Sequence, residues 1–166
     1  DRPELNNLTV RLSFMSDFTD HTRLLYGSMY SEDGRDEDGN IEVVISQECM
    51  VKSRLLLGEV LEFIYMKDYE GNPIRFKIVG FYDKAQSEDF YWQYEPSELN
   101  NVVFMNEALF REMFTGENAF KFTITCQYFA LFDYKKVTAL DVPDLKAYTD
   151  YLYDESPYRN TLSDPD

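Results

Sequence analysis

The segment Val60–Tyr82 constrains the fold more than any other part of this sequence. Two runs rich in β-branched and aromatic residues, Val60–Met66 and Ile74–Tyr82, flank the tetrapeptide Glu70-Gly71-Asn72-Pro73. Residues of the first kind are common in strands, whereas Gly, Asn and Pro are typical of turns. The segment therefore predicts a β-hairpin, and the fold of the chain must accommodate this antiparallel pair.

Further strands are predicted outside the hairpin. Their residues either alternate between apolar and polar or form short β-branched runs, as half-buried and buried strands do. The predicted strands are Leu8–Phe14, Ile41–Ile45, Val102–Met105 and a long one at Phe120–Phe132.

Three helices are predicted, each after a residue that can cap the free N–H groups of its first turn. In the second helix, Leu109, Phe110, Met113 and Phe114 share one face and are predicted to be core. The helices, each with its cap in parentheses, are Gln47–Arg54 (Ser46), Glu107–Phe114 (Asn106) and a final one through Leu152 (Asp141).

The order of these elements favours an α+β fold with a mixed or mainly antiparallel sheet and short helices. Uneven connections and the hairpin argue against a doubly wound fold. A chain of 166 residues suits one domain, or two small lobes that share a core. We expect a possible inserted lobe at about 24–118, with 8–14 and 120–153 in the second lobe and 157–166 as a tail.

Charge restricts the classes of partner. The formal net charge is −15, from 31 acidic and 16 basic residues. A field of this sign repels phosphate backbones and anionic membrane surfaces, so nucleic acid is not an expected partner. Hydrophobic residues at 44% and aromatic residues at 16% nevertheless supply ample material for a packed core.

No apolar run is long enough to cross a membrane, and the richest, Tyr128–Phe132, is far too short. The start of the chain also lacks the basic and apolar regions of a signal peptide. Because the chain begins at Asp1-Arg2-Pro3, we expect it to be an excised domain of a longer protein.

The two cysteines, Cys49 and Cys126, lie far apart and form no CxxC motif. With one histidine in the chain they cannot form a common zinc set. Cys126 falls in an apolar stretch, which predicts a buried free thiol. A disulfide between the two cysteines is left open.

The acidic stretch Ser31–Val44 resembles part of an EF-hand calcium loop. If Gly39 takes the sixth position, Asp36 and Asp38 fall at the third and fifth. The first and twelfth positions then become Gly34 and Ile45, which have no side-chain ligand. No metal site is therefore predicted, and the acids are interpreted as a solvated connector that could bind a cation only weakly.

No catalytic motif is present. His21 is the only histidine, and the chain has no GxSxG elbow, no Walker A sequence and no GxGxxG. The 31 acidic residues offer too many carboxylate pairs for any one to be informative. The sequence predicts no catalytic residue, no cofactor and no enzymatic activity.

Four aromatic residues gather within the segment Phe90–Tyr94, in a predicted loop between Asp83 and Asn101. One interpretation is a surface that grips a partner, because aromatic side chains bury large areas at low entropic cost. The other is a loop that folds back and buries them against the sheet. The candidate partner-binding residues are Phe90, Tyr91, Trp92 and Tyr94.

The segment from about Leu24 to Phe114 resembles the extracytoplasmic domain of FtsX-like and MacB-like ABC transporter permeases, the MacB-like periplasmic core. In that family a "vvIS" strand and cap precede a helix, and then come "lGxxL" and "f.IVG" in a returning strand. The matching residues here are Val43-Val44-Ile45-Ser46, Leu57-Gly58-Glu59-Val60-Leu61 and Phe76-Lys77-Ile78-Val79-Gly80. The likeness is looser for Phe120–Leu152, and the region before the vvIS strand is shorter than is usual in MacB-like domains.

The resemblance implies a non-catalytic domain outside the cytoplasm, at the cell surface or in the periplasm, held between transmembrane helices of a membrane-embedded, dimeric permease. A cytoplasmic ATPase subunit would drive motions that this domain converts into substrate export or activation of an extracytoplasmic protein or peptide partner. The alternative is a secreted or surface binding module for peptide or carbohydrate that uses the same aromatic residues.

Overall fold

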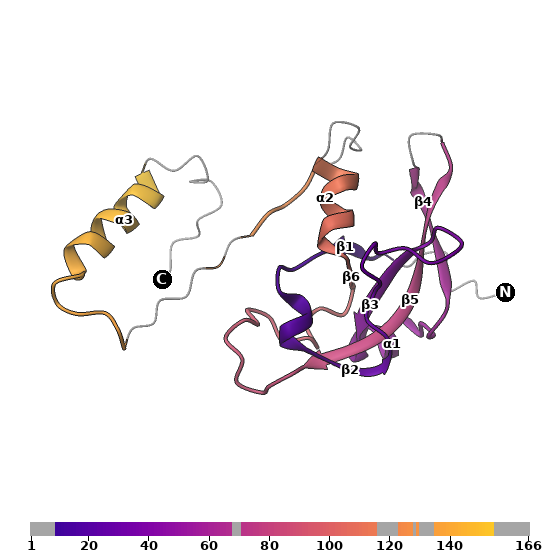
Figure 1. The fold of residues 1–166 in the computed structure, drawn as a ribbon, viewed down its shortest axis with the longest axis horizontal. Coiled ribbons are helices and arrows are strands. Elements are labelled where there is room, and N and C mark those ends of the chain that lie inside the picture. The colour runs from indigo at the N-terminus through magenta and orange to yellow at the C-terminus, as the bar shows by residue number, and fades with distance from the viewer. Residues whose placement is uncertain (1–8, 68–70, 116–122, 128, 130–134, 155–166) are drawn as a thin grey trace. The chain divides into compact units, whose positions relative to one another are not determined.

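The computed structural model describes residues 9–67, 71–115, 123–127, 129 and 135–154 (Figure 1). The chain divides into two compact units, Asp1–Phe122 and Thr123–Asp166. In chain order the elements are β1 (Arg11–Ser13), the 3₁₀ helix η2 (Phe18–His21), β2 (Thr22–Gly27), β3 (Ile41–Ser46), α1 (Gln47–Ser53), β4 (Val60–Lys67), β5 (Pro73–Lys84), β6 (Val102–Met105), α2 (Glu107–Thr115) and α3 (Val142–Asp154).

The first unit contains a six-stranded sheet in the order β1-β6-β3-β5-β2, with β4 also paired to β5. β1 pairs with β6 and β3 pairs with β5 in parallel, whereas the β2–β5, β3–β6 and β4–β5 pairs are antiparallel. The sheet is therefore mixed, and the predicted α+β class is confirmed. The β4–β5 pair is the hairpin predicted from Val60–Tyr82.

β3 and β5 form the centre of the sheet. Every residue of β3 except Glu42 is buried, as expected for a strand paired on both edges. Along β5, Gly80 lies opposite Gly27 of β2, and a Cβ atom at position 80 would approach the backbone oxygen of Ser28 to 2.3 Å. Gly80 therefore permits a close approach of backbone that any side chain would obstruct.

α1 begins directly at the end of β3. The hydroxyl oxygen of Ser46 accepts a hydrogen bond from the N–H of Cys49 at 3.1 Å, so the predicted cap is confirmed. Cys49 of the helix and Leu55 of the turn after it are both buried. Gly58, with φ of +79°, then occupies the left-handed region at the corner that leads into β4.

α2 follows β6 in the same manner. The side-chain oxygen of Asn106 accepts from the N–H of Leu109 at 3.1 Å, which confirms this cap. The four apolar residues predicted to form the inner face of α2, Leu109, Phe110, Met113 and Phe114, are all buried.

In the second unit, the predicted final helix is present as α3. Asp141 immediately precedes it, but its carboxylate accepts from the N–H and hydroxyl of Thr138, each at 2.7 Å. These bonds hold the pKa of Asp141 below its usual range. The acidic residue therefore fixes the turn before the helix.

The long strand predicted at Phe120–Phe132 is wrong for the part that the structure describes. Thr123–Gln127 and Phe129 are not in a strand, and they pair with none of the six strands of the sheet. An apolar run becomes a strand only when a neighbouring strand satisfies its backbone groups.

The prediction that Cys126 is buried is also wrong, since Cys126 is exposed. Both cysteines are free.

The predicted division into a lobe of 24–118 and a lobe of 8–14 with 120–153 stays a prediction. Arg11–Ser13 pair with Val102–Phe104 in the sheet of the first unit.

Two predicted features lie outside the described residues. They are the tail, 157–166, and Gly116 just past the end of α2. Within the described ranges, no helix combines the length and the apolar character that crossing a membrane requires.

Candidate functional site

The loop between β5 and β6, residues 85–101, carries the aromatic segment and lies beside η2 (Figure 1). Trp92 is only 8% exposed and belongs to a core cluster with Phe18 and Tyr82, whose ring centroids each lie 5.9 Å from that of Trp92. Its indole N–H donates to the backbone oxygen of His21 at 3.1 Å. Trp92 thus anchors the loop to the core.

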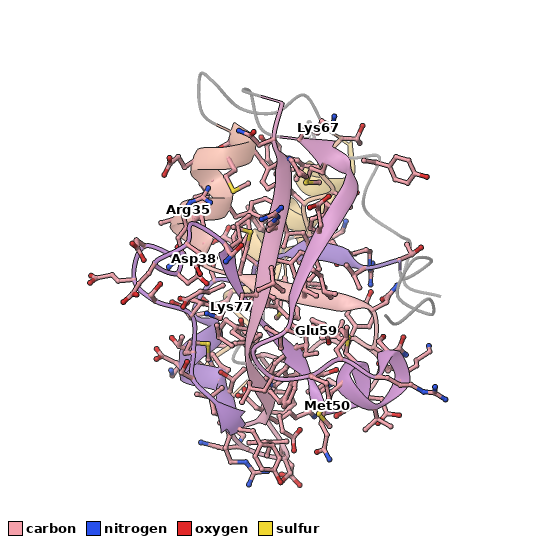
Figure 2. The ribbon with its side chains drawn as sticks, turned by 90° about the vertical axis from the view of Figure 1, so that its right-hand side faces the viewer. Arg35, Asp38, Met50, Glu59, Lys67 and Lys77 are labelled. Atoms are coloured by element: carbon pink, nitrogen blue, oxygen red, sulfur yellow. The ribbon has the colours of Figure 1, made fainter. Side chains whose placement is uncertain are left out.

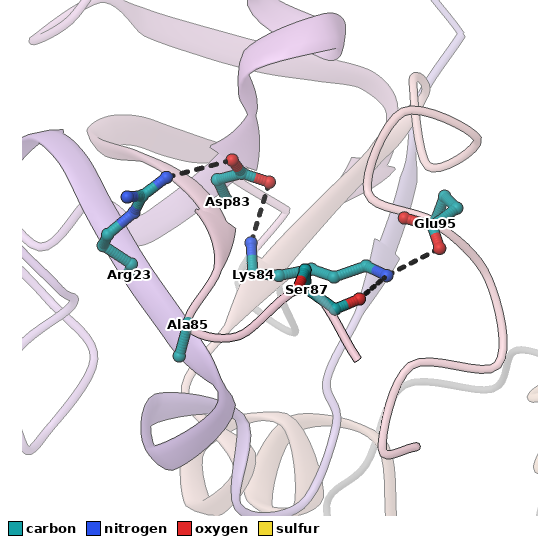
Figure 3. Close-up of a pocket in the computed structure, with 6 residues that line it drawn as sticks. All are labelled: Arg23, Asp83, Lys84, Ala85, Ser87 and Glu95. Atoms are coloured by element: carbon teal, nitrogen blue, oxygen red, sulfur yellow. Dashed lines mark hydrogen bonds and ion pairs between the residues drawn. The ribbon is translucent and has the colours of Figure 1, made fainter. Parts of the chain in front are cut away.

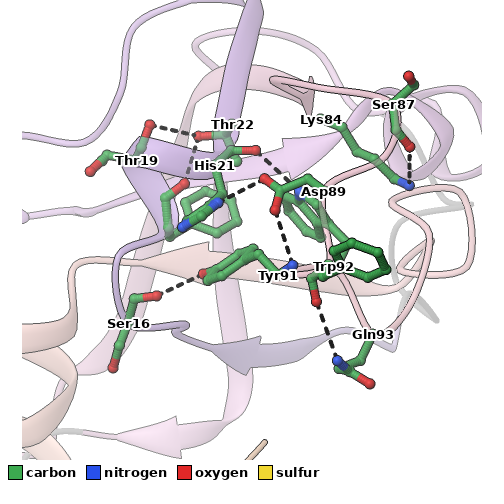
Figure 4. A network of polar contacts seen from close by, with 12 residues as sticks. Ser16, Thr19, His21, Thr22, Lys84, Ser87, Asp89, Tyr91, Trp92 and Gln93 are labelled. Carbon is green, nitrogen blue, oxygen red and sulfur yellow. Dashed lines mark hydrogen bonds and ion pairs between the residues drawn. The ribbon is translucent and has the colours of Figure 1, made fainter. Parts of the chain in front are cut away.

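Tyr91 forms a second anchor (Figure 4). Its ring stacks on the imidazole of His21, with centroids 3.9 Å apart and planes 4° from parallel. Its hydroxyl donates to the backbone oxygen of Ser16 at 2.8 Å. Burial is the main cause that raises the pKa of Tyr91, so its phenol stays protonated and can keep donating.

His21 and Asp89 form a third anchor. His21 Nδ1 lies 2.7 Å from Asp89 Oδ2, and the other carboxylate oxygen accepts from the N–H of Tyr91 at 3.0 Å. The hydrogen bond to His21 lowers the pKa of Asp89 more than any other contact does. The two partners are 68 residues apart, and no local signal in the sequence predicted that they would meet.

The four predicted partner-binding residues are therefore not equivalent. Trp92 is buried and Tyr91 is half-buried, whereas Phe90 is 79% exposed and Tyr94 is 49% exposed. The segment combines two aromatic residues that hold the loop with two that remain accessible. This arrangement could bind a partner, because the accessible rings are attached to a fixed backbone.

A surface hollow of about 430 Å³ lies beside this loop, lined by Arg23, Asp83, Lys84, Ala85, Ser87 and Glu95 (Figure 3). Arg23 pairs with Asp83 at 3.3 Å, and Lys84 pairs with Glu95 at 2.6 Å. Two acids and two bases balance one another here, so the lining offers no net charge to attract an ion. The Lys84–Glu95 pair adds a further tie between β5 and the loop.

The acidic stretch before β3 is more ordered than a solvated connector. Asp36 is 8% exposed in its side chain and accepts from the N–H groups of Asp38 and Asn40, the amide of Asn40 and the ammonium of Lys77. Figure 2 shows Lys77 on β5 close to this stretch. The Asn40 hydrogen bond is the main cause that lowers the pKa of Asp36, to about 2.

The hydrogen bonds of Asp36 join residues of this stretch to one another and to Lys77 of β5, so they hold the loop in place. The neighbouring acids Glu32, Asp33, Glu37 and Asp38 are exposed, as predicted for a solvated turn. Among the residues that the structure describes, no three His, Cys, Asp or Glu side chains are grouped so that they could hold a metal ion.

Comparison of the chain with models of known families, with curated proteins and with solved structures finds no match.

Proposed function

We propose that this chain is the non-catalytic extracytoplasmic domain of an FtsX-like or MacB-like ABC transporter permease. The domain would lie at the cell surface or in the periplasm, attached to transmembrane helices of a dimeric, membrane-embedded subunit. A cytoplasmic ATPase subunit would drive the motion, and the domain would couple it to substrate export or to activation of a partner.

One observation carries this proposal: the residues that support the resemblance form a single packed unit. Val43–Ser46 lie in β3, and Ile78 and Gly80 lie opposite Val43 and Val44 in β5. The Ser46 cap, α1 and the corner at Gly58 lead from β3 into β4, which pairs with β5. A shared order of short apolar motifs supports common architecture more strongly when the motifs pack against one another.

A second candidate is a secreted or surface module that binds peptide or carbohydrate. The exposed rings of Phe90 and Tyr94 favour it, since accessible aromatic side chains suit both kinds of ligand. Both candidates assign a binding role to the same loop, and they differ in what surrounds the domain in the full-length protein.

The reading frame of the parent gene tests the proposal. We expect hydrophobic spans flanking this domain and an ATPase gene beside it. A signal peptide followed by this domain and a stop codon would exclude the permease and leave the second candidate.

In the complete transporter, we expect the double variant Phe90→Ala/Tyr94→Ala to lower substrate export or partner activation. Tyr65→Ala is the matched control, because Tyr65 is an aromatic residue of β4 with 96% exposure. Equal activity of the double variant and the control, with both folded, would remove the loop from the coupling mechanism.

A further inference from the structure

The aromatic segment presents two exposed rings from a loop that the fold holds in place. Phe90 and Tyr94 are accessible, and the residues between them are tied to the core by Tyr91 and Trp92. A surface whose backbone is already ordered loses little conformational entropy when a partner binds. The loop is therefore suited to recognition of a specific chemical group.

Exposed acids occur on the loop that carries these rings and on η2 beside it. Asp17 and Asp20 lie at η2, and Glu88 and Glu98 lie in the loop, and all four are exposed. The contacts of Tyr91 with Ser16 and of Trp92 with His21 bring η2 and the loop together (Figure 4).

Lys52 donates to the side-chain oxygen of Asn100 in the loop at 2.9 Å, whereas two other basic side chains beside the loop do not cancel this charge. Arg23 and Lys84 are each paired with an acid of their own, Asp83 and Glu95. Burial is the first cause that raises the pKa of Tyr91, and the carboxylates of Asp17 and Asp89 raise it further. The Tyr91 ring of the loop thus lies within the field of Asp17 at η2 and of Asp89.

We propose that Phe90 and Tyr94, with the acids Asp17, Asp20, Glu88 and Glu98, form a docking surface for a basic segment of a protein partner. Arginine side chains of the partner stack on the two rings and pair with the carboxylates around them. Charge complementarity selects this partner, because the acids repel anionic chains and contribute little to a neutral one. The inference rests on the proposed function, for which it names the chemistry of the partner.

The experiment measures binding of three probes to the 166-residue chain by isothermal titration calorimetry. The probes are a short arginine–glycine repeat peptide, the same repeat with glutamate in place of arginine, and a neutral β-linked oligosaccharide. We expect binding of the arginine peptide alone. Binding of the oligosaccharide without binding of the arginine peptide would overturn the proposal and favour a carbohydrate module.

Variants then locate the binding surface. We expect Phe90→Ala/Tyr94→Ala to weaken binding of the arginine peptide about tenfold, by loss of two cation–π contacts. Tyr65→Ala should leave the affinity unchanged. Equal affinity of the double variant and the Tyr65→Ala control would show that net charge alone attracts the peptide, and would overturn the proposal.

Variants that remove acidic side chains test the role of charge independently of the two rings. Glu88→Gln/Glu98→Gln should weaken the arginine peptide and reduce the dependence of its affinity on salt. Glu37→Gln/Asp38→Asn removes the same number of acids from the stretch before β3 and should have a smaller effect. Equal losses in the two double variants would overturn the proposal, while urea midpoints confirm that each variant folds.

The result of the peptide-binding experiment can be distinguished from the result that tests the proposed function. Peptide binding is a property of the chain itself, whereas the permease assignment depends on the reading frame and on transport. A chain that binds the arginine peptide through this loop but lacks flanking spans would retain the inference and exclude the permease.

Discussion

At the scale of single residues, replacing Asp36 tests most directly what orders the acidic stretch, because its carboxylate accepts the hydrogen bonds there. An asparagine at this position keeps one acceptor oxygen but turns an N–H₂ group toward Asn40 and Lys77, which are both donors. We expect Asp36→Asn to lower the free energy of unfolding by about 1–3 kcal/mol, measured by urea denaturation. Glu37→Gln, at the exposed next position, should change it by less than about 0.5 kcal/mol.

The effect of Asp36 should also depend on pH. Its folded-state pKa of about 2 lies below the ordinary 3.8, so the ionised group stabilises the fold above 3.8 and loses this effect as the pH falls toward 2. The difference in urea midpoint between the wild type and Asp36→Asn should therefore shrink over that range. A constant difference would mean that the carboxylate acts without its charge.

At the scale of elements, Asn106 joins α2 to the acidic stretch. Its side-chain oxygen caps α2, and its amide donates to the backbone oxygens of Glu32 at 3.0 Å and Ser31 at 3.4 Å. Asn106 thus has two roles: its side-chain oxygen is an acceptor for the helix, and its amide group is a donor for the acidic stretch.

Two substitutions separate these roles. Asn106→Ala removes both and should cost about 1–2 kcal/mol of unfolding free energy. Asn106→Asp keeps the acceptor for α2 but turns a carboxylate oxygen toward the backbone oxygens of Ser31 and Glu32, so its cost should fall on the acidic stretch and not on the helix. Both should speed hydrogen exchange of the amides of Gly34 and Gly39. Full protection of these amides in Asn106→Asp would show that the donor role does not hold the stretch.

Elements whose cause is local were predictable from the sequence. The Ser46 and Asn106 caps, the β4–β5 hairpin and the inner face of α2 each depend on residues a few positions apart. Gly80 also gave a usable signal, since a glycine within a strand often marks a close approach of backbone. By contrast, the apolar run at Phe120–Phe132 has the pattern of a strand, but the pattern does not show whether another strand is available to pair with it.

The candidate site was predictable only in part, because its geometry depends on distant pairs. The cluster of aromatic residues marked the loop, but burial of Trp92 and exposure of Phe90 follow from packing against Phe18 and Tyr82. The same holds for Lys77 and Asp36, which pair across 41 residues. A single sequence does not reveal which of its many charges will meet.

At the scale of the whole molecule, the excess of acids over bases sets the dominant electrostatic term. The 31 acidic residues outnumber the 16 basic ones, which gives the net charge of −15. The mutual repulsion of the acidic residues is relieved when the chain expands, so it opposes the folded state. Surface ion pairs offset little of this, since exposed pairs contribute weakly.

Salt should therefore stabilise this protein. Raising NaCl from about 10 mM to about 150 mM shortens the Debye length from about 30 Å to about 8 Å and screens the repulsion. We expect the urea midpoint to rise over this range. The triple variant Glu37→Gln/Glu88→Gln/Glu112→Gln, at three exposed positions, should show a higher midpoint at low salt and a smaller rise. A midpoint that falls with salt would mean that attractive pairs, such as Lys77–Asp36, outweigh the repulsion among the remaining acids.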